Sequence, residues 1–170
     1  MPTAVVGDIS FETVLPRAWH TCGLSSIHAV FCWGGDLLQM KSAIPERVAG
    51  LSDVSTITTG HFHDCALARG GTAFCWGTNT DGELGNGTTR DSAVPQRVLT
   101  TRRFVSIAAG GNIDVSTPGK VATWGFTCAV TADDGSLLCW GDNRHGALGN
   151  GSTDRKLIPT PASTDLRGAY

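Results

Sequence analysis

The sequence predicts an all-β protein assembled from about three copies of one repeat, and three observations support this prediction. The tripeptide Cys-Trp-Gly occurs three times, at residues 32–34, 75–77 and 139–141. Glycine contributes 22 of the 170 residues, which indicates many tight turns. The apolar stretches are short and bounded by Gly and Asp clusters, a pattern typical of strands and hairpins rather than helices.

The second and third copies match well beyond the tripeptide. Residues 76–91 align with residues 140–155, and Pro95 and Pro159 follow at the same distance from their cysteines. The first copy lacks seven residues, including a Leu-Gly-Asn-Gly turn, and the third copy carries an insertion of thirteen at about 111–123. Without that insertion the repeat is about 51 residues long, a period typical of propellers and other repeat arrays.

The chain therefore divides into a degenerate repeat over residues 1–48, a second repeat over 49–98 and a third over 99–170. In each repeat we expect four short antiparallel strands: an inner strand, a second strand, a third that ends in Cys-Trp-Gly, and a fourth. The fourth strand includes a proline such as Pro95, which suits a sheet edge because proline has no N–H group to donate.

Each Cys-Trp-Gly cysteine has another cysteine ten or eleven residues upstream. Hairpin geometry places the members of a pair directly opposite each other, close enough for a disulfide. Two interpretations remain open, namely buried free thiols and disulfides, and an even number of cysteines paired in register favours disulfides. Disulfides predict an oxidising location, either secreted, periplasmic or at the cell surface. The pairs are Cys22 with Cys32, Cys65 with Cys75 and Cys128 with Cys139.

Composition and motifs argue against several functions. Lys and Arg total 13 against 15 Asp and Glu, so a net charge of −2 provides no basic excess for nucleic acid. No apolar run approaches the roughly 18 residues of a membrane helix, and residues 1–18 lack the pattern of a signal peptide. No nucleophile turn or phosphate loop appears, so we expect no enzyme, no catalytic residue and no cofactor.

The only metal-like cluster in the sequence is His61-x-His63 followed by Asp64. Alternation along a strand places the two histidines on one side, where they could supply two ligands. Two ligands are weak support for a metal site, so we expect hydrogen-bonding histidines and no metal. Residues 79–83 are similar to a calcium loop but lack its carboxylate pattern, and we interpret them as a turn.

Several motifs together resemble the regulator of chromosome condensation repeat. They are His20-Thr21-Cys22-Gly23-Leu24, Phe31-Cys32-Trp33-Gly34, Cys65-Ala66-Leu67, Gly82-Glu83-Leu84-Gly85-Asn86-Gly87, Val94-Pro95 and Ala108-Ala109-Gly110. Members of that family fold as seven-bladed β-propellers with four antiparallel strands in each blade, so the resemblance implies blades of this type. The paired cysteines are similar to those of secreted and receptor-ectodomain members.

The chain departs from the family in carrying about three repeats instead of seven. Both ends fall partway through the pattern, so we expect a partial propeller or open arc that is a fragment of a longer protein. Association of several copies into a homo-oligomeric ring is the alternative, because an arc leaves two blade faces uncovered.

The insertion in the third repeat is the leading candidate for a binding site, because insertions in repeat proteins often gather on the binding face. Aromatic residues near the starts of the second strands extend this candidate surface. The predicted partner-binding residues are Trp19, His61, Phe62, Asn112, Ile113, Asp114, Lys120 and Trp124. Structural roles are predicted for Trp33, Trp76 and Trp140, packed between blades, and for Gly85 and Gly149.

These features predict a protein-interaction module that binds an unidentified protein partner through loops on one face. The family resemblance adds a first alternative, a guanine-nucleotide exchange factor-like regulator of a small GTPase, which oxidised cysteines would argue against. A second alternative is a carbohydrate-binding module that uses Trp19, Trp124 and nearby polar loops.

Overall fold

The computed structural model describes residues 5–17, 19–35, 41–114 and 122–163, which form three four-stranded antiparallel sheets. Sheet 1 consists of β1 (Phe11–Pro16), β2 (His20–Ser25), β3 (Val30–Gly35) and β4 (Lys41–Arg47). Sheet 2 consists of β5 (Val54–Thr59), β6 (His63–Ala68), β7 (Ala73–Gly77) and β8 (Ser92–Arg97). Sheet 3 consists of β9 (Phe104–Asp114), β10 (Ala122–Thr131), β11 (Leu137–Gly141) and β12 (Lys156–Pro161).

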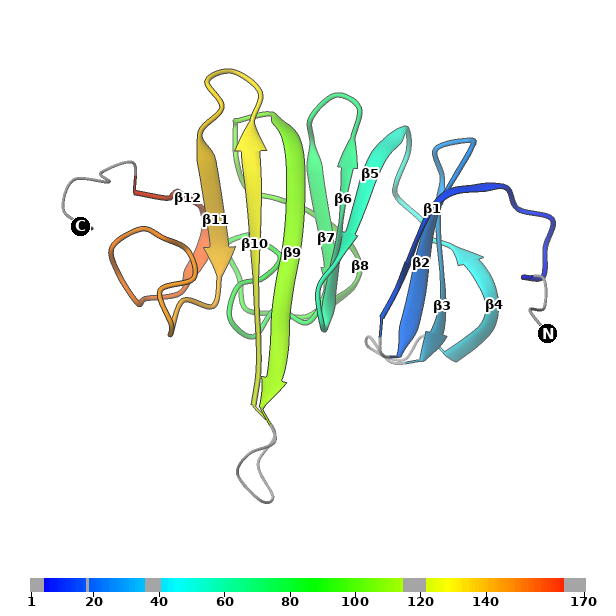
Figure 1. The fold of residues 1–170 in the computed structure, drawn as a ribbon, viewed down its shortest axis with the longest axis horizontal. Coiled ribbons are helices and arrows are strands. Elements are labelled where there is room, and N and C mark those ends of the chain that lie inside the picture. The colour runs from blue at the N-terminus through cyan, green and yellow to red at the C-terminus, as the bar shows by residue number, and fades with distance from the viewer. Residues whose placement is uncertain (1–4, 18, 36–40, 115–121, 164–170) are drawn as a thin grey trace, which may run out of the picture.

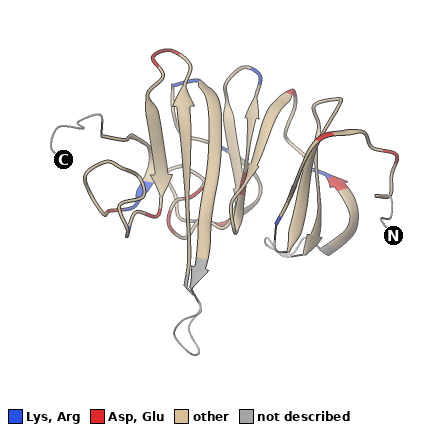
Figure 2. Ribbon diagram, in the orientation of Figure 1, with Lys and Arg blue, Asp and Glu red and all other residues tan. Residues whose placement is uncertain are grey.

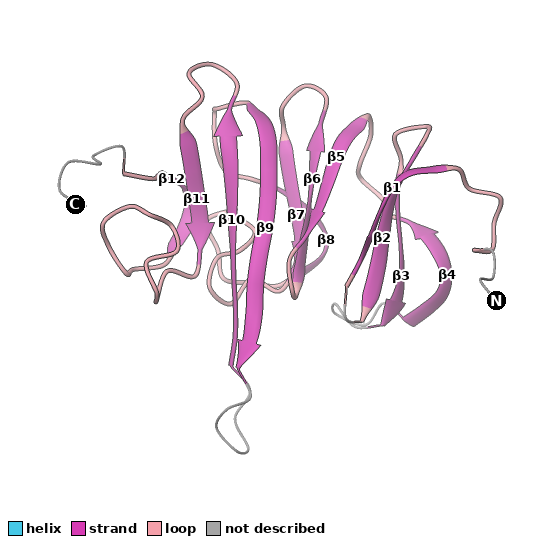
Figure 3. Ribbon diagram, viewed as in Figure 1, coloured by secondary structure: helices cyan, strands magenta, loops and turns pink. Residues whose placement is uncertain are grey.

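The three sheets follow one another as blades of a partial, unclosed propeller (Figure 1). Strands within a sheet are neighbours in chain order, and the first strand of each later sheet also contacts the sheet before it: β5 contacts β2, while β9 contacts β5 and β6. All the regular structure in the described ranges is strand (Figure 3), and none of it is a helix able to cross a membrane.

The register between the second and third strands of each sheet brings the cysteines face to face. Cys22 pairs with Cys32, Cys65 with Cys75 and Cys128 with Cys139, each with Cα atoms 4.1 Å apart. All six cysteines are joined in these disulfides. Tight turns make this register possible; for example, Gly71 closes the β6–β7 hairpin with a φ of 77°, a conformation that favours glycine.

Two hydrophobic clusters fill the spaces between successive sheets. One cluster joins the Cys22–Cys32 disulfide of sheet 1 to Trp76 of sheet 2, and the other joins the Cys65–Cys75 disulfide of sheet 2 to Trp140 of sheet 3. The tryptophan of each later sheet therefore packs on the disulfide side of the sheet before it. Trp33 differs from the prediction of packing between blades: it is half-buried against Phe11, and none of the sheets formed by the described residues packs on its outer side.

The long β7–β8 and β11–β12 connections are organised by buried asparagines. The amide group of Asn79 donates to the carbonyls of Thr88 and Arg90, at 2.9 and 3.1 Å, and its oxygen accepts the N–H of Leu84. Asn143 makes the equivalent bonds in sheet 3. A side chain thus satisfies the buried backbone groups of the loop, and residues 79–83 form the interior of this turn.

The insertion in sheet 3 has more regular structure than the protruding loop predicted for 111–123. Its described residues lengthen the two strands, with Asn112 opposite Trp124 and Asp114 opposite Ala122. The result is a two-stranded arm that projects beyond the neighbouring sheets (Figure 1). Extended pairing prevails over the turn-forming composition of this stretch because the two halves of the insertion hydrogen-bond to each other.

Candidate partner-binding surface

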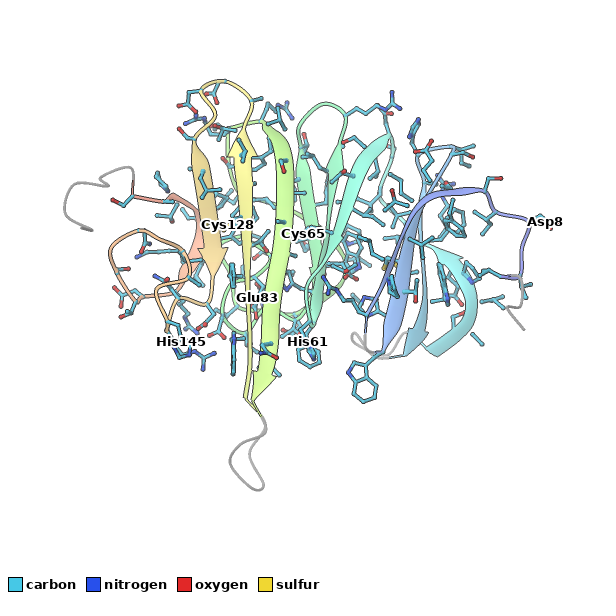
Figure 4. The ribbon with its side chains drawn as sticks, in the orientation of Figure 1. Asp8, His61, Cys65, Glu83, Cys128 and His145 are labelled. Atoms are coloured by element: carbon cyan, nitrogen blue, oxygen red, sulfur yellow. A yellow bond between two sulfur atoms is a disulfide. The ribbon has the colours of Figure 1, made fainter. Side chains whose placement is uncertain are left out.

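The β1–β2, β5–β6 and β9–β10 connections all leave the sheets at one end, which we call the hairpin end. The projecting β9–β10 arm marks this end in Figure 1, and Figure 4 shows His61 and His145 beside it. Antiparallel pairing with chain-order topology is the cause, since every connection between a first and a second strand must fall on the same side.

A small cleft at the hairpin end is built from one repeat position in all three sheets. Arg17, Gly60 and Gly110 each follow the same point of a first strand, and together with His61 and Gly111 they line a cleft of about 130 Å³. The Arg17 guanidinium crosses to sheet 2, where it donates to Thr59 Oγ1 at 2.8 Å and to the Thr59 carbonyl. The Arg17 side chain therefore forms one wall of the cleft, at a repeat position where sheets 2 and 3 have Gly60 and Gly110.

Aromatic side chains lie on the connections around this cleft. Trp19, in the β1–β2 connection, is 62% exposed, which is unusual for so large an apolar group. His61 and Phe62 of the β5–β6 connection are half-buried, with their rings edge to face and 4.4 Å between centroids. Exposed aromatic groups of this kind are typical anchors of protein interfaces.

Trp124 lies at the base of the arm and is held by the β11–β12 connection. The Arg144 guanidinium lies 5.9 Å from the centre of the indole ring, and the His145 ring lies 6.2 Å from it. Arg144 also bonds Asp142 at 2.6 Å and Asp81 at 3.2 Å, and donates to the Thr123 carbonyl. These contacts, chiefly the bond to Asp142, raise the pKa of Arg144, so a permanent cation ties the arm to sheets 2 and 3.

The predicted partner-binding residues thus come from all three sheets at the hairpin end. Trp19 lies in the β1–β2 connection of sheet 1, and His61 and Phe62 lie in the β5–β6 connection of sheet 2. Asn112, exposed on β9, and Trp124 belong to the arm. Ile113 and Asp114 are the last residues of β9, and Lys120 lies outside the described residues. Acidic and basic residues are interspersed along the described ribbon, as Figure 2 shows.

Sequence reasoning did not identify the polar pairs buried between the sheets. His20 Nε2 lies 3.1 Å from both carboxylate oxygens of Asp64, and His63 Nε2 lies 2.9 Å from Thr127 Oγ1. Burial raises the pKa of Asp64, an effect that His20 opposes, and burial lowers the pKa of His63 to about 4. Each histidine faces the residue that follows the histidine position of the next repeat. That position holds Thr21, Asp64 or Thr127 in the three repeats, so no recurring residue type marked it in the sequence.

These histidines do not form a metal site among the described residues. His20, Cys22 and Asp64 place their ligand atoms within 4.8 Å of one another, but the Cys22 sulfur is bonded to Cys32. His63 lies in the interface between sheets 2 and 3, whereas His61 contacts Phe62 at the surface. The two histidines therefore act separately, one in packing and one beside the cleft.

Glu83 is a further buried group with a displaced pKa. Burial raises the pKa of its carboxyl to about 7, although Oε2 accepts the Asp81 N–H at 2.8 Å. Its carbonyl accepts the indole N–H of Trp140 at 2.8 Å, so this residue belongs to the interface between sheets 2 and 3. The third repeat has Ala147 at the equivalent position, which is why the repeat pattern did not single it out.

The sequence matches the model for the regulator of chromosome condensation repeat over residues 70–115 and 134–167. The Ultraviolet-B receptor UVR8 of Arabidopsis thaliana is 37% identical over 83 residues, which cover 48% of this chain and 16% of the receptor. Prp20p from Saccharomyces cerevisiae superposes with a TM-score of 0.73 at 20% identity, over 92% of this chain and 39% of that chain. Human WBSCR16 gives 0.73 at 23% identity, over 95% and 42%.

The chain thus spans less than half the length of each of these proteins. At such sequence identities the likeness to the two solved structures concerns the fold alone. It agrees with sheets of the propeller type that do not close into a ring within this chain.

Proposed function

We propose, for a chain that belongs to the regulator of chromosome condensation repeat family, that it is an interaction module which binds a protein partner at its hairpin end. The observation that carries the proposal is the set of aromatic groups there, above all Trp19, which is 62% exposed. Large aromatic groups surrounded by polar loops supply the central contacts of protein interfaces.

The solved relatives support protein binding in general terms. The structure of Prp20p was described together with its binding properties to Gsp1p and histones, and Kap60 was crystallised bound to the same yeast protein. Those partners belong to Prp20p. For this chain they support the coarser proposal that a surface of the repeat fold recognises another protein.

The disulfides favour a partner outside the reducing interior of the cell. Cross-strand disulfides in all three sheets suit a secreted, periplasmic or cell-surface protein. An exchange factor that acts on an intracellular GTPase would work in a compartment that reduces such bonds. The extracellular interaction module is therefore the better proposal of the two.

Carbohydrate binding has less support from the geometry. A sugar-binding surface needs an aromatic face open to the ring, but the Trp124 indole is covered by Arg144 and flanked by His145. Trp19 belongs to sheet 1 and Trp124 to sheet 3, so the two tryptophans do not form one platform.

The test is a binding screen of the oxidised chain against a panel of extracellular proteins and a glycan array. We expect a protein ligand whose affinity falls at least about tenfold in Trp19→Ala and Phe62→Ala. Ile27→Ala is the matched control, because Ile27 is 76% exposed in the β2–β3 turn at the opposite end. Equal losses in the control, or binding to glycans alone, would overturn the proposal.

A further inference from the structure

The interface between sheets 1 and 2 encloses three side chains of the types that bind transition metals. They are an imidazole, a cysteine sulfur and a carboxyl group, from His20 and Cys22 of β2 and from Asp64 of β6. Their relative exposures are 8%, 1% and 2%, so all three are held inside the interface. His20 and Cys22 lie on one side of β2 because side chains alternate along a strand, and Asp64 faces them from the next sheet.

The ligand atoms of this group have nearly the spacing of a tetrahedral zinc centre. His20 Nε2 lies 3.1 Å from both carboxylate oxygens of Asp64, and Cys22 Sγ lies 3.5 Å from Asp64 Oδ2. Ordinary zinc–ligand bonds in tetrahedral geometry place nitrogen and oxygen about 3.4 Å apart, and sulfur and oxygen about 3.6 Å apart. The sulfur and the ring nitrogen lie within 4.8 Å of each other. Small movements of the side chains therefore suffice to surround a cation.

In the structure the sulfur of this group is engaged in a covalent bond. Cys22 is joined to Cys32 in a disulfide, whereas the thiolate is the form of cysteine that binds a metal. The oxidised chain accordingly has two ligands at this place, and the chain with that bond open has three. One bond thus decides whether the group is a metal site.

A divalent cation also suits the charge of the opened group. A thiolate and a carboxylate carry two negative charges between them, and buried charges of one sign need a compensating cation. A thiolate, an imidazole and a carboxylate are all established zinc ligands, and the thiolate favours zinc over magnesium or calcium. The chemistry of the ligands therefore points to Zn²⁺.

The interface between sheets 2 and 3 has the same geometry but different chemistry. His63 and Cys65 hold the repeat positions of His20 and Cys22, and Thr127 stands in place of the carboxyl group. His63 Nε2 lies 2.9 Å from Thr127 Oγ1, and Cys65 Sγ lies 4.0 Å from it. A neutral hydroxyl is not an ordinary zinc ligand, so this interface supplies two ligands even when its disulfide is open.

The third cysteine pair lacks the histidine as well. Phe126 holds the position two residues before Cys128 that a histidine holds in the other two sheets. Within the described residues, the three ligand types therefore meet at the interface between sheets 1 and 2 and not at the other cysteine pairs.

We propose that the interface between sheets 1 and 2 is a redox-gated zinc site. A dithiol transfers two electrons to the Cys22–Cys32 disulfide and becomes a disulfide itself, while each cysteine sulfur takes up one proton. Zn²⁺ then binds the ring nitrogen of His20, the carboxylate of Asp64 and the sulfur of Cys22, which releases its proton. Cys32, freed in the same step on the facing strand, is the candidate for the fourth ligand.

The metal and the disulfide are alternative cross-links of one part of the molecule. The disulfide joins β2 to β3 within sheet 1, whereas the metal joins β2 to β6 and so links sheet 1 to sheet 2. The site stays closed in an oxidising compartment and opens where a dithiol is supplied. None of the ligands is a predicted partner-binding residue, so the inference does not rest on the proposed function.

The test begins with the wild-type chain and Zn²⁺ alone, measured by isothermal titration calorimetry. We expect no binding to the oxidised chain and one tightly bound Zn²⁺ in the chain reduced with a phosphine. Co²⁺ in place of Zn²⁺ should give the visible absorption of a tetrahedral site with thiolate ligation.

Cys32→Ala tests the site without a reductant, since it leaves Cys22 as a free thiol while the other two disulfides stay closed. This variant should bind one Zn²⁺. Adding Asp64→Thr reproduces the chemistry of the other interface and should weaken zinc affinity at least about tenfold. The expectation is a lower bound, because replacing a residue that merely supports a ligand already costs about 10–100-fold.

Cys75→Ala is the matched control in sheet 2. It frees Cys65 beside His63 and Thr127, and it should bind no Zn²⁺. Adding Thr127→Asp to this control recreates the ligand set of the first interface, so the double variant should acquire zinc binding.

Circular dichroism with and without Zn²⁺ reports whether each variant is folded. A reduced wild type that binds no metal overturns the proposal. Equal zinc affinities in Cys32→Ala and Cys75→Ala also overturn it, as does an affinity that Asp64→Thr leaves unchanged. Free thiols of an unfolded chain would bind in that indiscriminate way.

Discussion

The two inter-sheet interfaces fill one repeat position with different chemistry. Between sheets 1 and 2, the imidazole of His20 meets a carboxyl group, that of Asp64; between sheets 2 and 3, His63 meets the hydroxyl of Thr127. All four side chains are buried. A buried imidazole at this repeat position therefore has a polar partner in both interfaces, and that partner need not carry a charge.

This difference determines how much unfolding free energy each interface loses when one member of its polar pair is removed. A buried carboxyl group has a high desolvation cost, which is why burial raises the pKa of Asp64 while the contact with His20 opposes the rise. A threonine hydroxyl costs less to bury and meets its needs with one donor and one acceptor. We therefore expect the interface between sheets 1 and 2 to be the more sensitive to substitution.

The largest effect is expected for Asp64→Ala. Removing one member of a buried pair leaves the imidazole of His20 without its partner, and such changes cost about 3–5 kcal/mol of unfolding free energy. Denaturant unfolding measures the loss. Asp53→Asn is the control, because asparagine tolerates the positive φ of residue 53, so the change breaks only the surface pair with Arg69 and should cost no more than about 1 kcal/mol. Equal losses would show that burial of the pair is irrelevant to its contribution.

The second prediction concerns pH at the interface between sheets 2 and 3. His63 binds a proton near pH 6.5 when unfolded but only near pH 4 when folded, so its contribution to stability is lost as the pH falls through this window. Glu83 releases its proton near pH 4.5 when unfolded but near pH 7 when folded, so its contribution is lost as the pH rises. The two dependences oppose each other between about pH 4.5 and 6.5.

Glu83→Gln should therefore reveal the dependence of His63. Relative to wild type, the variant should gain about 3 kcal/mol of unfolding free energy between pH 4 and pH 7, because the opposing titration is absent. His63→Gln should show the opposite trend. Asp64 and His20 remain in both variants, so their titration cancels in the comparison with wild type. Parallel pH profiles for wild type and Glu83→Gln would contradict the prediction.

Much of each sheet could be predicted because it depends on local spacing. Strand order, the opposed cysteines and the turn at Gly71 follow from residues within one repeat. The contact of His20 with Asp64 joins positions 44 apart, and the partner position holds Thr21, Asp64 or Thr127 in the three repeats. No residue type recurs there in all three, so the pattern did not mark the position.

The candidate surface was predictable in part for the same reason. Exposed aromatics beside first strands follow from the repeat register, as at Trp19 and His61. The cation over Trp124 depends instead on how the β11–β12 connection returns to the arm, which is a tertiary contact. Pairing across the insertion is likewise decided by hydrogen bonds between its two halves rather than by its composition.

The smallest effect is expected for Thr127→Val, which preserves shape but removes the hydroxyl between His63 and the Glu83 carbonyl. Leaving the imidazole N–H without an acceptor should cost about 1–2 kcal/mol, less than Asp64→Ala, because no charged group is involved. Thr21→Val is the matched control, since Thr21 holds the same repeat position in sheet 1, where its side chain is half-buried and not buried. That change should stay within about 0.5 kcal/mol. Equal values for the two threonines, measured by denaturant unfolding, would mean that the hydroxyl contributes nothing to the interface and that the histidine position depends on packing alone.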